Sequence, residues 1–267
     1  MIKDEKFARL EQIIASMNSV IIGFSGGVDS VFLAKVARDV LPDKAIAATA
    51  DSPSLARSEL ESCINLAKQI RIMHKIVRTT EIENPEYLLN PSNRCYFCKI
   101  SLYAKLAELA KELNIAVIAN GLNYDDLQEY RAGNKAAEEF NVRSPLVEAR
   151  MTKEEIRKYS AVLGLPTFDK PAMPCLASRI PTDSVITPEK LLQVEQAELY
   201  LRTQFNLYNL RARHFGNIVK IEADKKDLER LNAEKESIGK RMQDIGFEKV
   251  EICEYKRGGI VKLPVIN

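Results

Sequence analysis

The stretch VIIGFSGGVDS, residues 20–30, decides the fold, because it joins an apolar run to a helix-forming segment through two adjacent glycines. A short apolar run before such a turn is typical of a buried parallel strand. Gly26 and Gly27 permit the backbone angles with which amide groups approach an oxyanion, and Ser25 and Ser30 add hydroxyl donors. The following helix directs the positive end of its dipole at the same place. The stretch therefore predicts a strand, an anion-binding loop and a helix.

The glycines in this loop follow neither of the two commonest nucleotide-binding patterns. A Walker A loop would carry a Lys-Ser or Lys-Thr pair, and a dinucleotide-binding fingerprint would space its glycines differently. Asp29 would repel a bare phosphate, so a divalent cation between the two is implied. A tight strand–helix turn with a serine N-cap is the alternative that the residues alone leave open.

Three further short strands are expected, at residues 44–50, 71–77 and 115–120. Helical patterns separate them, which predicts an α/β fold with a parallel sheet and right-handed crossovers. Ligands bind such sheets outside the carboxyl ends of the strands. The polar stretches SGGVDS, DSPS and NGLNYDD all follow predicted strands, so we expect the functional site at that edge of the sheet.

The remainder of the chain predicts a smaller α+β domain. Thr152 and Glu155 form a capping box that opens a helix over 153–163, and a proline-rich loop follows this helix. Beyond the loop come a helix, a β-hairpin, a further helical stretch and a last strand, over residues 187–255. We expect a nucleotide domain at 1–170, a cysteine-bearing linker at 171–185 and a substrate domain at 186–267.

Composition and charge argue against several classes of protein. The 267 residues are 46% apolar and 28% charged, as in ordinary globular proteins. A formal net charge of +2 gives no sign of nucleic-acid binding, and no apolar run approaches the roughly 18 residues of a membrane span. The charged start, MIKDEKFARL, is unlike a secretory signal. We therefore expect a cytoplasmic protein that binds neither nucleic acid nor membrane, and whose cysteines stay reduced. A homo-oligomer is a separate expectation, which composition does not decide.

Five cysteines are present, and three of them are candidates for sulfur or metal chemistry. Cys63 lies on the apolar stripe of a predicted helix and Cys253 in the last predicted strand, so both are expected to be structural. Cys95 and Cys98 form a CxxC pair between a turn and a helix, and Cys175 lies in the proline-rich loop. Three thiolates suit a [4Fe–4S] cluster with one open iron. A zinc site, which would want a fourth ligand, and a metal-free pair remain open alternatives.

The hexapeptide SGGVDS resembles the signature of the PP-loop ATP pyrophosphatases, and NGLNYDDLQEYRAG (120–133) is similar to a downstream segment of the same group. Together with PAMPCLASRIP (171–181), these motifs resemble the LarE family of sulfur transferases over nearly the whole chain. The resemblance implies that ATP, with Mg²⁺, is cleaved to AMP and pyrophosphate while a substrate oxygen is adenylated. It also implies the substrate, pyridinium-3,5-biscarboxylic acid mononucleotide, whose carboxylates become thiocarboxylates during biosynthesis of the nickel-pincer nucleotide.

Members of this family differ in their source of sulfur. In some, a lone cysteine matching Cys175 surrenders its own sulfur and becomes dehydroalanine. Others carry an added CxxC pair and are proposed to use a cluster. The RCYFC segment, residues 94–98, places this chain with the second kind, so the resemblance implies a [4Fe–4S] cluster on Cys95, Cys98 and Cys175 that takes up sulfide or another sulfur donor. The catalytic residues so implied are Asp29 and Cys175.

The resemblance also assigns residues to two binding sites. The residues expected to bind ATP are Phe24, Ser25, Gly26, Gly27, Asp29, Ser30, Ala50, Ser52, Gly121 and Asp125. Those expected to bind the phosphorylated, carboxylated substrate are Ser178, Arg179, Glu198, Arg211 and Arg213. Arg211 and Arg213 alternate along a predicted strand and so share a face, from which guanidinium groups hold anions in bidentate fashion. An ordinary solvated strand face is the alternative for this pair.

Two other functions are compatible with the same loop. A tRNA thiolase would use similar chemistry but would need a broad basic surface, which a net charge of +2 does not favour. A sensor of adenine nucleotides would bind ATP without forming AMP and pyrophosphate from any candidate acid. The predicted function is ATP-dependent sulfur transfer, with these two as the alternatives.

Overall fold

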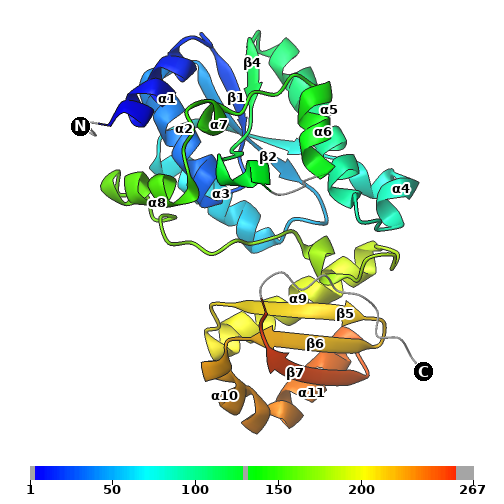
Figure 1. Cartoon of the computed structure of the whole chain (residues 1–267). Coiled ribbons are helices and arrows are strands. Elements are labelled where there is room, and N and C mark those ends of the chain that lie inside the picture. Colours follow the sequence, from blue (N-terminus) through cyan, green and yellow to red (C-terminus); the bar gives the residue numbers. More distant parts are fainter. Residues whose placement is uncertain (1–3, 129–131, 257–267) are drawn as a thin grey trace. The chain divides into compact units, whose positions relative to one another are not determined.

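The computed structural model describes residues 4–128 and 132–256, and the chain forms two compact units (Figure 1). The first unit consists of Met1–Glu81 and Asn93–Met173, and the second of Ile82–Ser92 and Pro174–Asn267. Part of the predicted segment 120–133, residues 129–131, lies outside the described residues.

A four-stranded parallel sheet forms the centre of the first unit, with strand order β3-β2-β1-β4. Its strands are β1 (Val20–Gly23), β2 (Ala45–Asp51), β3 (Met73–Arg78) and β4 (Val117–Ala119). The chain proceeds from β1 outward to β3 and then returns to place β4 on the other side of β1. The strand order therefore reverses at β1, and a crevice for ligands is expected outside the carboxyl ends of β1 and β4. The predicted α/β class with a parallel sheet is confirmed.

Helices cover both faces of this sheet, because successive strand residues alternate between two apolar cores. Val20 and Ile22 pack with one set of helices, whereas Ile21 packs with the other. The first set is α1 (Glu5–Ala15), α2 (Val28–Val40), α3 (Arg57–Gln69), α7 (Pro145–Glu148) and α8 (Lys153–Val162), and the second is α5 (Arg94–Glu112) and α6 (Ala132–Glu139). Short 3-10 helices lie at η1 (Glu81–Glu83) and η2 (Asp125–Gln128).

The start of α5 corrects one expectation. The sequence predicts the CxxC pair ahead of a helix, but α5 already begins at Arg94. Cys95 and Cys98 therefore lie in its first two turns. Tyr96, between them, donates a hydrogen bond of 3.0 Å from its hydroxyl to Glu139 at the end of α6. This contact with a neighbouring helix favours a helix over a turn at the CxxC pair. The local sequence pattern gives no sign of the contact.

A three-stranded sheet of order β5-β6-β7 forms the second unit. β5 (Leu210–Phe215) and β6 (Ile218–Ala223) form the predicted antiparallel hairpin, and β7 (Lys249–Glu254) runs parallel to β6. An apolar core joins this sheet to the helices α9 (Pro188–Phe205), α10 (Leu228–Ala233) and α11 (Lys235–Ile245). The further helical stretch predicted before the last strand is divided into η4 (Lys225–Asp227), α10 and α11. The predicted small C-terminal α+β sheet region is confirmed.

The segment Ile82–Ser92, which contains the short helix α4 (Pro85–Leu88), belongs to the second compact unit although it follows β3. Asn90 carries the attachment: its side-chain amide donates to the carbonyls of Ile180 and Pro181, at 3.2 and 2.7 Å. The Asp183 amide donates to the Asn90 carbonyl at 3.0 Å. The predicted limits 1–170, 171–185 and 186–267 remain a prediction, and nothing in the sequence pattern indicates this excursion.

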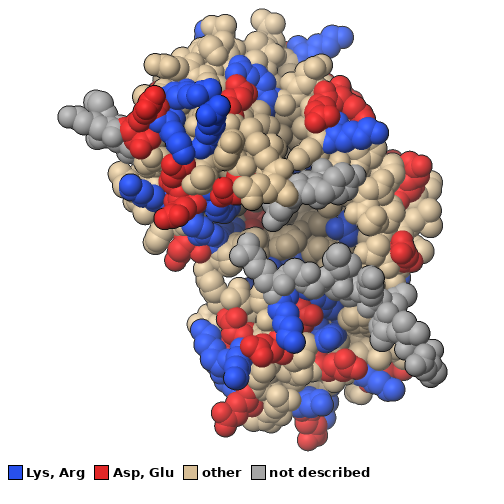
Figure 2. Space-filling model, in the orientation of Figure 1, with Lys and Arg blue, Asp and Glu red and all other residues tan. Residues whose placement is uncertain are grey.

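Acidic and basic side chains are interspersed over the described part of the face drawn in Figure 2. Such a mixture of signs is typical of a solvated protein surface. None of the helices in the described ranges is long and apolar enough to cross a membrane.

Candidate active site

The loop between β1 and α2 forms a tight cradle. Gly26 has a φ of +69°, a left-handed conformation that glycine adopts without strain. The Ser25 and Ser30 hydroxyls lie 3.2 Å apart, and the Ser30 hydroxyl donates to the Gly27 carbonyl at 3.1 Å. The Ser25 amide donates to the Ser30 hydroxyl at 3.3 Å. Both serines thus shape the loop at the N-terminus of α2, where the helix dipole favours an anion.

Groups beneath the loop fix its position. The Thr49 hydroxyl donates to the Phe24 carbonyl at 2.8 Å, so the His74 Nε2 atom, 2.9 Å from the same hydroxyl, is the donor in that contact. Burial lowers the pKa of His74, which is consistent with a neutral ring. A Cβ atom on Gly26 would lie 2.9 Å from the Cys63 sulfur. Cys63 is fully buried, as expected for a core residue, and burial raises the pKa of its thiol.

Asp29, in the first turn of α2, lies beside a lysine that the sequence analysis missed. The Lys153 ammonium donates to Asp29 Oδ2 at 2.6 Å, and the Lys153 backbone amide donates to Asp125 Oδ2 at 2.8 Å. Lys153 is the first residue of α8, where a cation is unfavourable for the helix dipole. A positive charge directly after the predicted Thr152 cap is unfavourable for the helix, and this feature of the sequence could have identified Lys153 as a functional residue.

The other oxygen of Asp29, Oδ1, is buried and has no hydrogen-bond partner among the described residues. Such an orphaned carboxylate oxygen is costly unless a ligand satisfies it. Mg²⁺ binds proteins through one or two carboxylates, with phosphate oxygens and water completing its shell. Asp29 at the mouth of a phosphate loop therefore fits a magnesium ion that arrives with a nucleotide.

A second lysine also reaches the loop from the chain beyond α8. The Lys170 ammonium donates to the Gly26 carbonyl at 3.3 Å and to Glu59 of α3 at 2.8 Å. Lys170 was not among the predicted residues. Because these two acceptors belong to the loop and to the helix beside it, Lys170 holds the loop against α3.

The remaining residues predicted to bind ATP lie after neighbouring strands of the same sheet. Ala50 is near the end of β2, and Ser52, which follows β2, is buried and accepts a hydrogen bond from the Ser54 amide at 3.2 Å. Gly121 follows β4, and a Cβ atom there would lie only 3.0 Å from the Ser30 amide nitrogen. The structure thus brings the predicted residues of the first unit to the carboxyl edge of β1, β2 and β4. Their contact with ATP stays a prediction.

The three candidate cysteines are divided between the units. Cys95 is exposed and Cys98 half-buried on α5 of the first unit. Cys175 is half-buried in the second unit, at the N-cap of the short 3-10 helix η3 (Leu176–Arg179). Within the described ranges, no group of three or more His, Cys, Asp or Glu side chains gathers to hold a metal ion. The cluster therefore stays a prediction.

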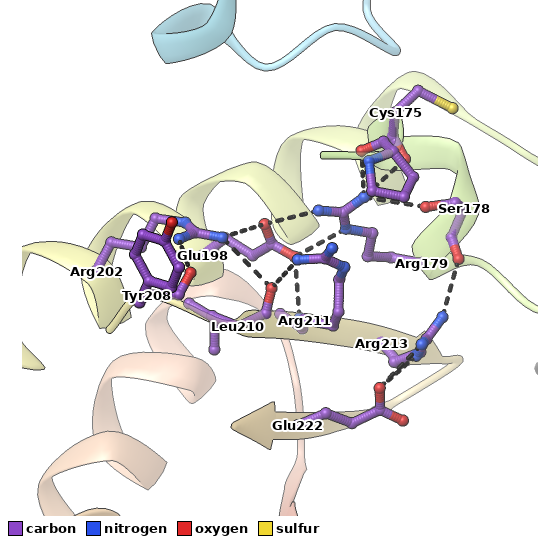
Figure 3. A network of polar contacts seen from close by, with 12 residues as sticks. Cys175, Ser178, Arg179, Glu198, Arg202, Tyr208, Leu210, Arg211, Arg213 and Glu222 are labelled. Carbon is purple, nitrogen blue, oxygen red and sulfur yellow. Dashed lines mark hydrogen bonds and ion pairs between the residues drawn. The ribbon is translucent and has the colours of Figure 1, made fainter. Parts of the chain in front are cut away.

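The residues predicted to bind the substrate come together in the second unit (Figure 3). Glu198 of α9 accepts hydrogen bonds from Arg179 at 2.8 and 3.1 Å. The Arg213 guanidinium pairs with Glu222 of β6 at 2.9 Å and donates to the Ser178 carbonyl at 3.2 Å.

Arg211 and Arg213 are buried on β5, where they are only 5% and 8% exposed. This burial argues against the alternative for the pair, an ordinary solvated strand face. Burial, with the neighbouring charge of Arg179, lowers the pKa of Arg211. The Arg211 guanidinium lies 5.5 Å from the ring centre of Tyr255 and donates to the Leu210 carbonyl at 2.6 Å. This face thus collects guanidinium groups away from bulk water, where an anion is bound most strongly.

Comparisons with known proteins bear on the class of protein to which the phosphate loop belongs. The NAD synthase family matches the chain over residues 4–87, which contain the phosphate loop. A phosphate loop of this kind at the carboxyl edge of a parallel sheet defines a PP-loop protein, a class that uses ATP and forms AMP and pyrophosphate.

Three relatives cover most of the chain. An uncharacterized protein of Synechocystis sp. is 47% identical over 219 residues, 82% of this chain and 81% of that protein. An uncharacterized protein of Methanocaldococcus jannaschii is 31% identical over 231 residues, 86% of this chain and 87% of that protein. The pyridinium-3,5-bisthiocarboxylic acid mononucleotide synthase of Lactiplantibacillus plantarum is 28% identical over 248 residues, 92% of this chain and 90% of that protein. The chain belongs to this family, the LarE family of ATP-using PP-loop enzymes.

Proposed function

We propose that this protein uses ATP to convert the carboxylates of pyridinium-3,5-biscarboxylic acid mononucleotide into thiocarboxylates. The observation that carries the proposal is the 28% identity, over 92% of the chain, with an enzyme named as the synthase of the bisthiocarboxylic acid product. Two features of the chain support it independently. They are the phosphate loop with Asp29 in the first unit and the buried arginines on β5 in the second.

The first half of the reaction makes a leaving group. A carboxylate oxygen of the substrate attacks the α-phosphorus of ATP, pyrophosphate departs, and an acyl adenylate remains. Asp29 would hold Mg²⁺ through Oδ1, and the ion would neutralise charge on the departing pyrophosphate when bound. Lys153, whose ammonium is 2.6 Å from Asp29 Oδ2, would add a second positive charge beside those oxygens. The amides of the Gly26–Gly27 turn would donate to phosphate oxygens.

The second half of the reaction replaces AMP by sulfur. A sulfide sulfur attacks the carbonyl carbon, and AMP leaves with the former carboxylate oxygen. We propose Cys95, Cys98 and Cys175 as ligands of a [4Fe–4S] cluster, which would supply this sulfide. Thiols are the donors such a cluster requires, and all three are free of disulfides. A reducing cytoplasm would keep them so, and we expect the enzyme to act there as a homo-oligomer.

The substrate carries a phosphate and two carboxylates, and we propose that Arg211 and Arg213 bind its phosphate with Ser178. The three buried arginines of this region outnumber its two glutamates, Glu198 and Glu222. Such an excess of positive charge in a buried place favours an anionic ligand.

The test is anaerobic turnover with ATP, Mg²⁺, sulfide and the dicarboxylate nucleotide, with thiocarboxylates counted per chain and the mass of the spent protein measured. Several products per chain with an unchanged protein mass would support the cluster. A single sulfur per chain, with loss of the elements of hydrogen sulfide at Cys175, would assign the sulfur to that residue instead. Cys95→Ser should stop only the first route, and Cys175→Ala should stop both. AMP formation that depends on tRNA and not on the nucleotide would overturn the proposal.

A further inference from the structure

All three nitrogens of the Arg179 guanidinium group donate hydrogen bonds within the protein. The side chain is 1% exposed, among the most buried in the described chain. Nε and Nη2 donate to the two carboxylate oxygens of Glu198, at 2.8 and 3.1 Å. Nη1 donates to the carbonyls of Pro174 and Cys175, the latter at 3.0 Å, and to the Ser178 hydroxyl at 2.9 Å (Figure 3). A substrate phosphate would have to displace Glu198 from a buried bidentate pair to reach this guanidinium, which is costly.

Glu198 makes a second connection, to the strand that carries the anion-binding arginines. Its Oε1 atom accepts a hydrogen bond of 3.1 Å from the backbone amide of Ala212. Ala212 lies between Arg211 and Arg213 on β5, so Glu198 holds the strand at the point from which both side chains project. One buried carboxylate therefore joins α9, the strand β5 and, through Arg179, the loop that contains Cys175.

We propose that Arg179 and Glu198 are a positioning pair, which sets the place of Cys175 relative to the Arg211–Arg213 face and does not bind substrate. This inference rests on the proposed function, because the pair joins the loop that contains Cys175 to the face that we propose to bind the substrate. Bidentate pairing gives the pair a fixed geometry. A buried ion pair is weak evidence for stability, so we assign this pair to positioning.

The contacts with the loop are to backbone, which explains how the pair holds Cys175 without blocking it. Arg179 binds the carbonyls of Pro174 and Cys175 and the Ser178 hydroxyl, while the Cys175 thiol stays half-buried and free of disulfides. Lysine has a single donor group and no planar fork, so Arg179→Lys keeps the charge but cannot hold Glu198 and the loop together.

The test combines three measurements on the full chain carrying Arg179→Lys, Glu198→Gln or Arg202→Lys. Arg202 contacts the same carboxylate at 3.7 Å from a more exposed position and so serves as the matched control. The alkylation rate of Cys175 by iodoacetamide is followed by peptide mass spectrometry, with Cys95 on the other unit as the internal reference. Binding of nicotinate mononucleotide, a pyridinium carboxylate nucleotide, is measured by calorimetry. Sulfur transfer is analysed as separate kcat and KM values.

For Arg179→Lys and Glu198→Gln, we expect alkylation of Cys175 to change at least fivefold while Cys95 is unaffected. Nicotinate mononucleotide should bind within threefold of the wild type, and kcat should fall at least tenfold with little change in KM. Arg202→Lys should leave all three values near those of the wild type.

A tenfold loss of nucleotide binding with unchanged labelling of Cys175 would show that Arg179 is a substrate ligand and overturn the proposal. A lower melting temperature with normal labelling and kinetics would reduce the pair to a purely structural role, which also overturns it. Glu198→Gln keeps the shape and the acceptor for Ala212, so it serves where Arg179→Lys fails to fold. Labelling and nucleotide binding need no sulfur transfer, so they decide the role of the pair even where the wild type makes no thiocarboxylate.

Discussion

Replacing Gly121 by alanine tests whether the loop after β4 is a wall of the ATP site. A Cβ atom there would lie 3.0 Å from the Ser30 nitrogen, 3.2 Å from the Ser30 Cα and 3.3 Å from the Asp29 carbonyl carbon. All three neighbours are backbone atoms of the first turn of α2, which cannot rotate aside as a flexible side chain would. Gly121 is not among the glycines with positive φ, so the added methyl group acts through contact and not through backbone strain.

The contact predicts that Gly121→Ala lowers the free energy of unfolding by about 1–2 kcal/mol. This value is in the lower part of the range for overpacked sites, because a shift of a few tenths of an ångström relieves the contact. Since that shift would move the amides that we propose to face the phosphates, a loss of the same size in ATP binding should raise the KM for ATP about 5- to 30-fold. Initial rates of pyrophosphate release at varied ATP give this value, and thermal unfolding reports any effect on the fold.

Gly239 provides the matched control, since its Cβ would meet no atom within 4 Å. Gly239 lies inside α11, so alanine should leave the KM for ATP unchanged and stabilise the helix by up to about 1 kcal/mol. A Gly121→Ala enzyme whose KM for ATP stays within twofold of the wild type would refute the placement of the nucleotide against Ser30.

Three further predictions concern single residues. Asp29→Ala should abolish Mg²⁺-dependent formation of AMP while leaving the melting temperature nearly unchanged, because it creates no core cavity; residual turnover above a few per cent would remove Asp29 from the metal site. Arg211→Ala or Arg213→Ala should weaken substrate binding by about 1.5–3 kcal/mol in calorimetry without altering the KM for ATP, and normal binding in both would place the substrate elsewhere. Burial, with the charge of Lys190, lowers the pKa of His214 to about 4. Its contribution to stability is therefore complete above about pH 6.5 and is lost as the pH falls toward 4, by about 2 kcal/mol after allowance for partial solvent screening. In denaturant titrations, the stability of His214→Gln should lack this acid-dependent loss. A pH profile of stability equal to that of the wild type would contradict this role of His214.

The sheet and the loop of the first unit follow from local patterns in the sequence. The apolar run before the phosphate loop is short, as in a strand buried on both faces. Gly26 has a left-handed backbone conformation, which favours glycine. The capping box of Thr152 and Glu155 is present as expected, with the Glu155 amide donating to Thr152 Oγ1 at 3.3 Å. Local chemistry decides each of these features, so the sequence is sufficient for them.

The features that sequence reasoning missed depend on contacts between distant residues. Lys153 reaches Asp29 across 124 positions, and no periodicity reports such a pair. Asn90 ties the segment after β3 to Ile180 across 90 positions. The resemblance assigns Arg179 to the substrate site, whereas its burial against Glu198 is a property of tertiary packing that no local pattern reports.

Adenylation of a substrate carboxylate is the central chemical claim, and oxygen-18 in the carboxylates of the pyridinium nucleotide tests it most directly. The carboxylate oxygen that attacks the α-phosphorus stays with phosphorus when sulfur displaces AMP. Mass spectrometry of the AMP should therefore find one oxygen-18 atom for each thiocarboxylate formed, with unlabelled pyrophosphate. Unlabelled AMP accompanying thiocarboxylate, or label in inorganic phosphate released together with ADP, would contradict adenylation.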